Sequence, residues 1–165
     1  MLRKSVFILC VLVAEIAFPI SRIGNNNRIQ DPQDRYSLSI PKDFSSVTEM
    51  RDGGAVLASG RFASSPPLPV DIQMQSFRSQ YPALVGKGQS DIETYFVGQS
   101  AAQWQNIKTK NGAISLFGEN DSVYMAISAC GDGRGYVLFA PKFDLIAQGM
   151  MEALQTTTYE LPCKN

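Results

Sequence analysis

Alternating apolar and polar residues predict strands at two places in the first half of the chain. Apolar residues alternate with serines over residues 36–40, and with Asp71, Gln73 and Gln75 over residues 70–76. A period of two is typical of a strand with one buried face. We expect another strand over residues 55–62, directly after a glycine-containing turn.

The second half of the chain consists mainly of short apolar segments separated by turn sequences. The segments are 113–117, 122–130 and 135–140, and the turn sequences are NG at 111–112, GEND at 118–121 and GDGRG at 131–135. The segments are rich in β-branched and aromatic residues, and glycine in the turns supplies the positive φ angles that tight hairpins need. We therefore expect antiparallel hairpins here.

Two segments have the period of a helix instead. Ser90 and Glu93 match a capping box, so a helix should begin at Ser90 and end near Trp104. Its apolar face would contain Ile92, Tyr95 and Phe96. A second helix is predicted near the C-terminus from the spacing of Phe143, Ile146, Ala147, Met150 and Leu154.

The order of these elements, β-β-β-α-β-β-β-β-α, predicts the fold class. It indicates an α+β protein with a mainly antiparallel sheet flanked by helices, an α-β-α sandwich. We assign residues 22–34, which are polar and rich in asparagine, to a linker, and residues 35–165 to a single α+β domain.

The first 21 residues have the form of a signal peptide. Arg3 and Lys4 precede an apolar run over residues 6–14, which is shorter than the about 20 residues of a membrane-spanning helix. No clean cleavage motif follows, so an uncleaved anchor is the alternative. We expect a periplasmic protein with no stable membrane span once the leader is removed.

Export changes the expected state of the cysteines. Cys10 leaves with the leader, so Cys130 and Cys163 remain. Two cysteines in an oxidising compartment most simply form one disulfide, and two buried free thiols are the alternative. Closing a loop of this length stabilises a fold by roughly 3.8 kcal/mol in the chain-entropy description.

Composition excludes several classes of function. The 15 basic and 15 acidic residues form no basic run, which argues against nucleic-acid binding. The chain contains no histidine, so Ser-His-Asp and Cys-His catalysis and His-ligated zinc are excluded. The GDGRG sequence has neither the G-x-G-x-x-G spacing nor the G-K-[ST] ending of phosphate-binding loops.

Two pairs of carboxylates are the remaining candidates for catalysis. Asp91 and Glu93, or Glu119 and Asp121, could serve as the acid and base of a glycosidase. Their positions in the first turn of a helix and in a hairpin turn explain them without catalysis. We predict no catalytic residues, no cofactor and no metal site.

The exposed polar loops are the candidates for binding, because loops on a rigid sheet commonly carry contacts. They are the GEND turn, the GDGRG turn and the sequence SSPPLP at 64–69. The predicted partner-binding residues are Glu119, Asn120, Asp121, Asp132, Arg134, Ser64, Ser65, Pro66 and Pro67.

The opening RYSLSIPKDF at 35–44, the mid-chain helix, the antiparallel strands and the helix after YVLFAPKF at 136–143 resemble the PsbP-like/DcrB-like α-β-α sandwich. The resemblance spans residues 35–160 and implies non-enzymatic binding or accessory roles. With the leader and the disulfide, the chain also resembles periplasmic immunity proteins. These neutralise a peptidoglycan-hydrolase (muramidase) effector of a type VI secretion system by blocking its active-site cleft. The alternative is an envelope accessory or small-ligand-binding domain with an apolar groove.

Overall fold

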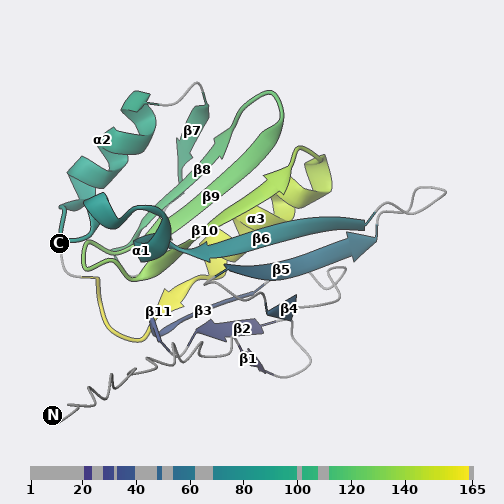
Figure 1. The fold of residues 1–165 in the computed structure, drawn as a ribbon, viewed down its shortest axis with the longest axis horizontal. Helices are drawn as coiled ribbons and strands as arrows, with labels where there is room; N and C mark the ends of the chain where they lie inside the picture. Colours follow the sequence, from purple (N-terminus) through teal and green to yellow (C-terminus); the bar gives the residue numbers. More distant parts are fainter. Residues whose placement is uncertain are drawn as a thin grey trace, which may run out of the picture.

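The computed structural model describes residues 21–23, 28–31, 33–39, 48–49, 54–61, 69–99, 102–107 and 112–163. Within these residues the chain forms two antiparallel sheets and the helices that cover them (Figure 1). The predicted α+β class, with a mainly antiparallel sheet flanked by helices, is confirmed.

The larger sheet has seven strands in the order β4-β5-β6-β10-β9-β8-β7. They are β4 (Thr48–Glu49), β5 (Gly54–Arg61), β6 (Pro69–Ser76), β7 (Gln103–Asn106), β8 (Ile114–Glu119), β9 (Val123–Ala129) and β10 (Gly135–Pro141). The strands predicted over 55–62 and 70–76 are therefore confirmed to within a residue. The predicted hairpins of the second half are confirmed as β8–β9 and β9–β10.

The smaller sheet has four strands in the order β1-β2-β3-β11. They are β1 (Ser21–Ile23), β2 (Arg28–Asp31), β3 (Tyr36–Ser39) and β11 (Thr158–Tyr159). The prediction of a linker over residues 22–34 is wrong, because β2 pairs with β3 and Ile29 is fully buried in the core. A single apolar residue between polar ones is too short a pattern to be recognised as a strand. Residues 1–20 lie outside the described residues, and the signal peptide stays a prediction.

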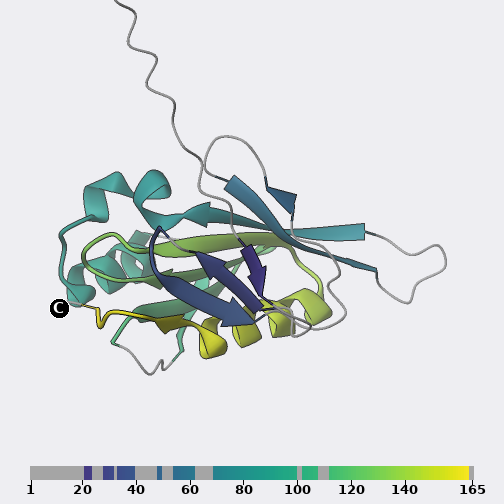
Figure 2. The same ribbon diagram turned by 90° about the horizontal axis from the view of Figure 1, so that it is seen from below.

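The helices cover opposite faces of the larger sheet (Figure 2). They are α1 (Phe77–Gln80), the short 3-10 helix η2 (Pro82–Leu84) and α2 (Gln89–Gln99) on one face, and α3 (Asp144–Thr156) with the smaller sheet on the other. No helix of the described residues is both long and apolar enough to cross a membrane.

The predicted helices are both present, with two corrections. Trp104 lies in β7 and not at the end of α2, because α2 ends at Gln99 and the chain then pairs with β8. Phe143 precedes α3 and is 42% exposed, whereas we expected it on the buried face. The remaining apolar residues of that face pack inward, and Ile146, Met150 and Leu154 are fully buried.

Alternation along β10 divides the core into two layers. Tyr136 and Leu138 contribute to the layer under α3, and Val137 contributes to the layer under α1 and α2. Burying each large apolar side chain contributes roughly 1.5–3 kcal/mol. The sheet is therefore held between two apolar layers, and its turns are carried on a rigid support.

The predicted disulfide is confirmed. Cys130 follows β9 and is fully buried, and it is joined to Cys163 in the C-terminal tail with a Cα–Cα distance of 5.0 Å. The bond attaches the tail to the same turn that contains the GDGRG sequence.

Candidate functional site

The turn between β8 and β9 is held by its own asparagine. The Asn120 side-chain Oδ1 accepts hydrogen bonds from the backbone N–H groups of Ser122 and Val123, both at 2.9 Å. This is the Asx geometry expected for the GEND sequence. Glu119, Asn120 and Asp121 therefore lie on a hairpin whose backbone is locally fixed.

Charged and apolar side chains surround this turn. The Lys142 Nζ lies 3.6 Å from the Glu119 carboxylate and 5.8 Å from the centre of the Tyr124 ring. Val123 is 37% exposed and Phe143 is 42% exposed. We call Glu119, Asn120, Asp121, Val123, Lys142 and Phe143 the tip surface. Backbone contacts connect the two segments of the tip surface: Val123 pairs with Pro141, and the Lys142 N–H donates a hydrogen bond to the Ser122 carbonyl at 3.2 Å.

The turn between β9 and β10 has a structural task. Arg134 forms an ion pair of 2.9 Å with Asp132 and donates to the carbonyl oxygens of Leu161 and Pro162, both at 3.1 Å. Its side chain is only 12% exposed. Gly135 has φ +133°, and a Cβ there would lie 2.1 Å from the Ser128 carbonyl oxygen. The GDGRG sequence thus turns the chain and holds the tail.

The predicted partner-binding residues do not come together. The two turns lie at opposite ends of β9, whose seven residues span about 24 Å. The tip surface contains Glu119, Asn120 and Asp121, whereas Asp132 and Arg134 lie at the other end. Ser64, Ser65, Pro66 and Pro67 lie outside the described residues. The two turns therefore form separate parts of the surface, and the tip surface contains only the first of them.

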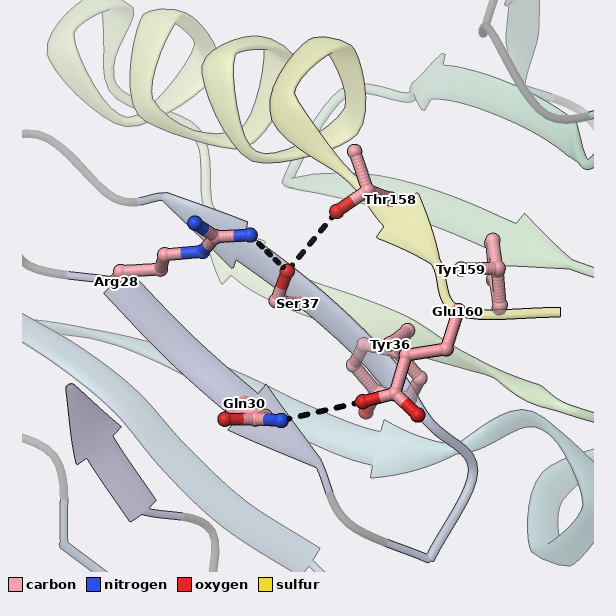
Figure 3. A pocket seen from close by; sticks show the side chains of 7 residues that line it. All are labelled: Arg28, Gln30, Tyr36, Ser37, Thr158, Tyr159 and Glu160. Carbon is pink, nitrogen blue, oxygen red and sulfur yellow. Dashed lines mark hydrogen bonds between the residues drawn. The ribbon is translucent and has the colours of Figure 1, made fainter.

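A pocket of about 270 Å³ lies on the outer face of the smaller sheet (Figure 3). It is lined by Arg28, Gln30, Tyr36, Ser37, Thr158, Tyr159 and Glu160. We call it the β3 pocket, because β3 forms its floor between β2 and the chain around β11. The sequence pattern did not predict this pocket, since Arg28 and Gln30 fall in the expected linker. The alternation of Arg28, Ile29 and Gln30 was the only signal for it.

Two polar bridges cross the floor of the β3 pocket (Figure 3). In the first, Arg28 Nη2 donates to Ser37 Oγ at 2.7 Å, and Ser37 Oγ lies 2.9 Å from Thr158 Oγ1. In the second, Gln30 Nε2 donates to the Glu160 carboxylate at 3.3 Å. A cation and an anion therefore lie in one pocket without pairing with each other.

Tyrosines support the pocket from beneath. Tyr36 and Tyr159 have ring centres 5.8 Å apart, and the Tyr159 hydroxyl lies 3.0 Å from Ser128 Oγ. Burial raises the pKa of both hydroxyls well above the ordinary value, so both stay protonated at neutral pH. The Tyr159 hydroxyl is therefore a fixed hydrogen-bonding group, and neither tyrosine serves as a base.

Asp34 is a buried carboxylate next to this group. It is 6% exposed, accepts a hydrogen bond from the Gly135 N–H, and lies 3.9 Å from the Arg78 guanidinium. Burial raises the pKa of Asp34, and nearby Asp31 raises it further, while the Gly135 hydrogen bond and Arg78 lower it. Within the described ranges, no three His, Cys, Asp or Glu residues gather as metal ligands.

Comparison with known proteins adds one structural likeness. No family model matches the chain, and no curated protein matches it. A crystal structure of a protein from Bacteroides thetaiotaomicron VPI-5482, at 1.50 Å resolution, is similar with a TM-score of 0.48 and 13% identity. The likeness covers 84% of this chain and 50% of that protein, so the chain spans half of that protein's length.

Proposed function

We propose that this protein is a non-enzymatic binding module that takes a protein partner on its tip surface. The exposed side chains of Val123 and Phe143 carry the proposal, because both residues belong to the same end of the sheet as the charged residues Glu119, Asp121 and Lys142. Exposed apolar side chains mixed with polar ones are typical of a protein–protein contact surface.

The support of the tip surface favours tight binding. Its turn joins two strands of the central sheet, and the Asn120 side chain fixes the turn backbone. A surface that is ordered before binding loses little conformational entropy when the partner arrives. This property suits an inhibitor that inserts a rigid projection into a cleft.

The more specific proposal is a periplasmic immunity protein that inhibits a cell-wall-degrading type VI secretion effector by occluding its active-site cleft. The disulfide supports an oxidising compartment. In this proposal Phe143 and Val123 would fill the cleft, while Glu119 and Asp121 would meet basic or metal-bearing groups around the catalytic centre of the effector.

The test is inhibition of a captured hydrolase. The protein is used as bait in envelope and secreted extracts of the producing bacterium, and the bound protein is purified and assayed for peptidoglycan turnover. We expect stoichiometric inhibition, and a loss of at least about a hundredfold in affinity for the double variant Val123→Asp/Phe143→Asp. Val97→Asp is the matched control, because Val97 is 55% exposed on α2.

Two results would contradict the proposal. One is capture of no stoichiometric protein partner. The other is equal inhibition by the double variant and the native protein, provided that both give the same thermal unfolding midpoint.

The β3 pocket favours a second candidate function, a small-ligand-binding domain of the envelope. The resemblance led us to expect an apolar groove for this role, but the β3 pocket is lined mainly by polar side chains. Mass spectrometry of the denatured protein distinguishes the two functions, since a co-purifying small molecule favours this one.

A further inference from the structure

The β3 pocket presents opposite charges to one small volume. Arg28 carries five N–H donors, and its described hydrogen bond to Ser37 uses only one nitrogen. Glu160 accepts from Gln30 through Oε1. Among the residues that the structure describes, no carboxylate lies within ion-pair distance of Arg28 and no cation within that distance of Glu160. Both side chains therefore retain charge-assisted bonding capacity for a ligand.

The strand register sets the spacing between these charges. Arg28 reaches Ser37, which pairs with Thr158, whereas the Glu160 N–H donates to the Arg35 carbonyl. Arg28 and Gln30 are alternate residues of β2, so their side chains leave the same face of the sheet from Cα atoms about 7 Å apart. Because Gln30 holds Glu160, the cation and the anion are carried at neighbouring places on one face of the sheet, where each can meet a different group of one small ligand.

The size and polarity of the pocket limit the kinds of ligand that it can hold. Its volume of about 270 Å³ lies just below the range of about 300–1,000 Å³ that is typical of pockets for drug-sized molecules. The hydroxyls of Ser37 and Thr158 and the amide of Gln30 also line the pocket, and all of them can bond a polar ligand.

We propose that the β3 pocket binds a free α-amino acid as its zwitterion. Arg28 binds the α-carboxylate through its forked guanidinium, and Glu160 binds the α-ammonium group through the oxygen that Gln30 does not occupy. Ser37 and Thr158 hydroxyls complete the contacts from the floor. This site is separate from the tip surface, and the inference does not rest on the protein-binding function.

The first experiment measures binding by calorimetry or ligand-observed NMR with a defined set of probes. The set contains glycine, L-alanine, L-serine, L-glutamate and L-lysine, each titrated up to about 10 mM. For the tightest of them, the N-acetylated and the amidated derivatives are the matched controls. We expect saturable binding, with each blocked derivative at least about tenfold weaker, because each lacks one charged contact.

Substitutions of Glu160 and Arg28 test which side chain binds which end of the ligand. Glu160→Gln should weaken the amino acid at least about tenfold and should remove the preference for it over the N-acetylated form. Arg28→Gln should likewise weaken the amino acid and should remove the preference for it over the amidated derivative. Arg28→Lys should restore only part of the affinity, because lysine lacks the forked guanidinium group. Glu119→Gln, an equivalent loss of charge at the tip surface, is the control and should bind normally.

The outcomes are decisive in either direction. Saturable binding that requires both free groups and both side chains supports the inference. Failure of every probe to saturate, or equal binding of free and blocked derivatives, overturns it. Val123→Asp/Phe143→Asp should leave amino-acid binding unchanged, so failure here and failure of the protein-binding proposal are seen separately.

Discussion

The Asp34 carboxylate accepts a hydrogen bond from the Gly135 backbone N–H at 3.2 Å, across 101 residues of sequence. The bond ties the segment between β2 and β3 to the start of β10. Gly135 also needs a positive φ angle of +133° and cannot carry a Cβ without striking the Ser128 carbonyl oxygen. Asp34 therefore stabilises a backbone conformation on which the β9–β10 hairpin depends.

The first prediction concerns the pH dependence of stability. The pKa of Asp34 is raised in the folded protein above its ordinary value of 3.8. Between pH 3.8 and the pKa of Asp34 in the folded protein, the folded state binds more protons than the unfolded state. The contribution of Asp34 to stability therefore falls as the pH rises through this window. The Asp34→Asn variant keeps a hydrogen-bond acceptor for the Gly135 N–H but does not titrate, so this fall in stability with pH should disappear. Urea unfolding at a series of pH values measures the difference between the two proteins.

Two further variants complete that test. Asp34→Ala leaves the Gly135 N–H without its acceptor and should cost about 1–3 kcal/mol at all pH values. Asp121→Asn, in the exposed β8–β9 turn, is the control for the loss of one carboxylate. If Asp34→Asn shows the same pH profile as the native protein, the buried carboxylate does not titrate as we describe.

The second prediction concerns Gly118 and the single tryptophan of the chain. A Cβ at Gly118 would lie 2.7 Å from Cε3 and Cζ3 of Trp104, so the indole must move in Gly118→Ala. We expect a loss of about 1–3 kcal/mol and a changed Trp104 fluorescence maximum. Gly98→Ala is the control, because nothing lies within 4 Å of its Cβ and alanine favours the helix by up to about 1 kcal/mol. Unchanged fluorescence in Gly118→Ala would contradict the contact.

The third prediction separates the two turns. Arg134→Gln loses the ion pair with Asp132 and charge-assisted bonds to two tail carbonyls, and it should cost about 1–3 kcal/mol in the free energy of unfolding. Lys142→Gln breaks a half-exposed ion pair with Glu119 and should cost less than about 1 kcal/mol. Denaturant titration of both variants measures the two costs, and a larger cost for Lys142→Gln would refute the assignment of Arg134 to the tail.

The fourth prediction concerns the disulfide. Replacing Cys130 and Cys163 together by serine should lower the free energy of unfolding by about 3–4 kcal/mol, because the bond closes a separation of 33 residues. Alkylation of the native protein followed by peptide mapping should leave both residues unmodified until a reductant is added. Modification of both before reduction would show free thiols, and would also remove support for an oxidising compartment.

Local pattern was enough to predict much of the sheet. Alternation along residues 70–76 predicted a strand, and the glycines of the GDGRG turn predicted a hairpin, because both patterns depend on residues adjacent in the sequence. β6 and the β9–β10 hairpin lie where they were expected. The two cysteines outside the predicted leader left one simple pairing, and that pairing is present.

Tertiary structure alone decided the candidate sites. The sequence by itself contained the residues of both turns, but only the antiparallel path of β9 places them at opposite ends of the sheet. In the β3 pocket Gln30 donates a hydrogen bond to Glu160, which lies 130 residues away in the sequence. The strand that carries Gln30, β2, has a single buried apolar residue. Beyond the short alternation over residues 28–30, such contacts leave no periodic signal, because their energy comes from groups that meet only once the chain has folded.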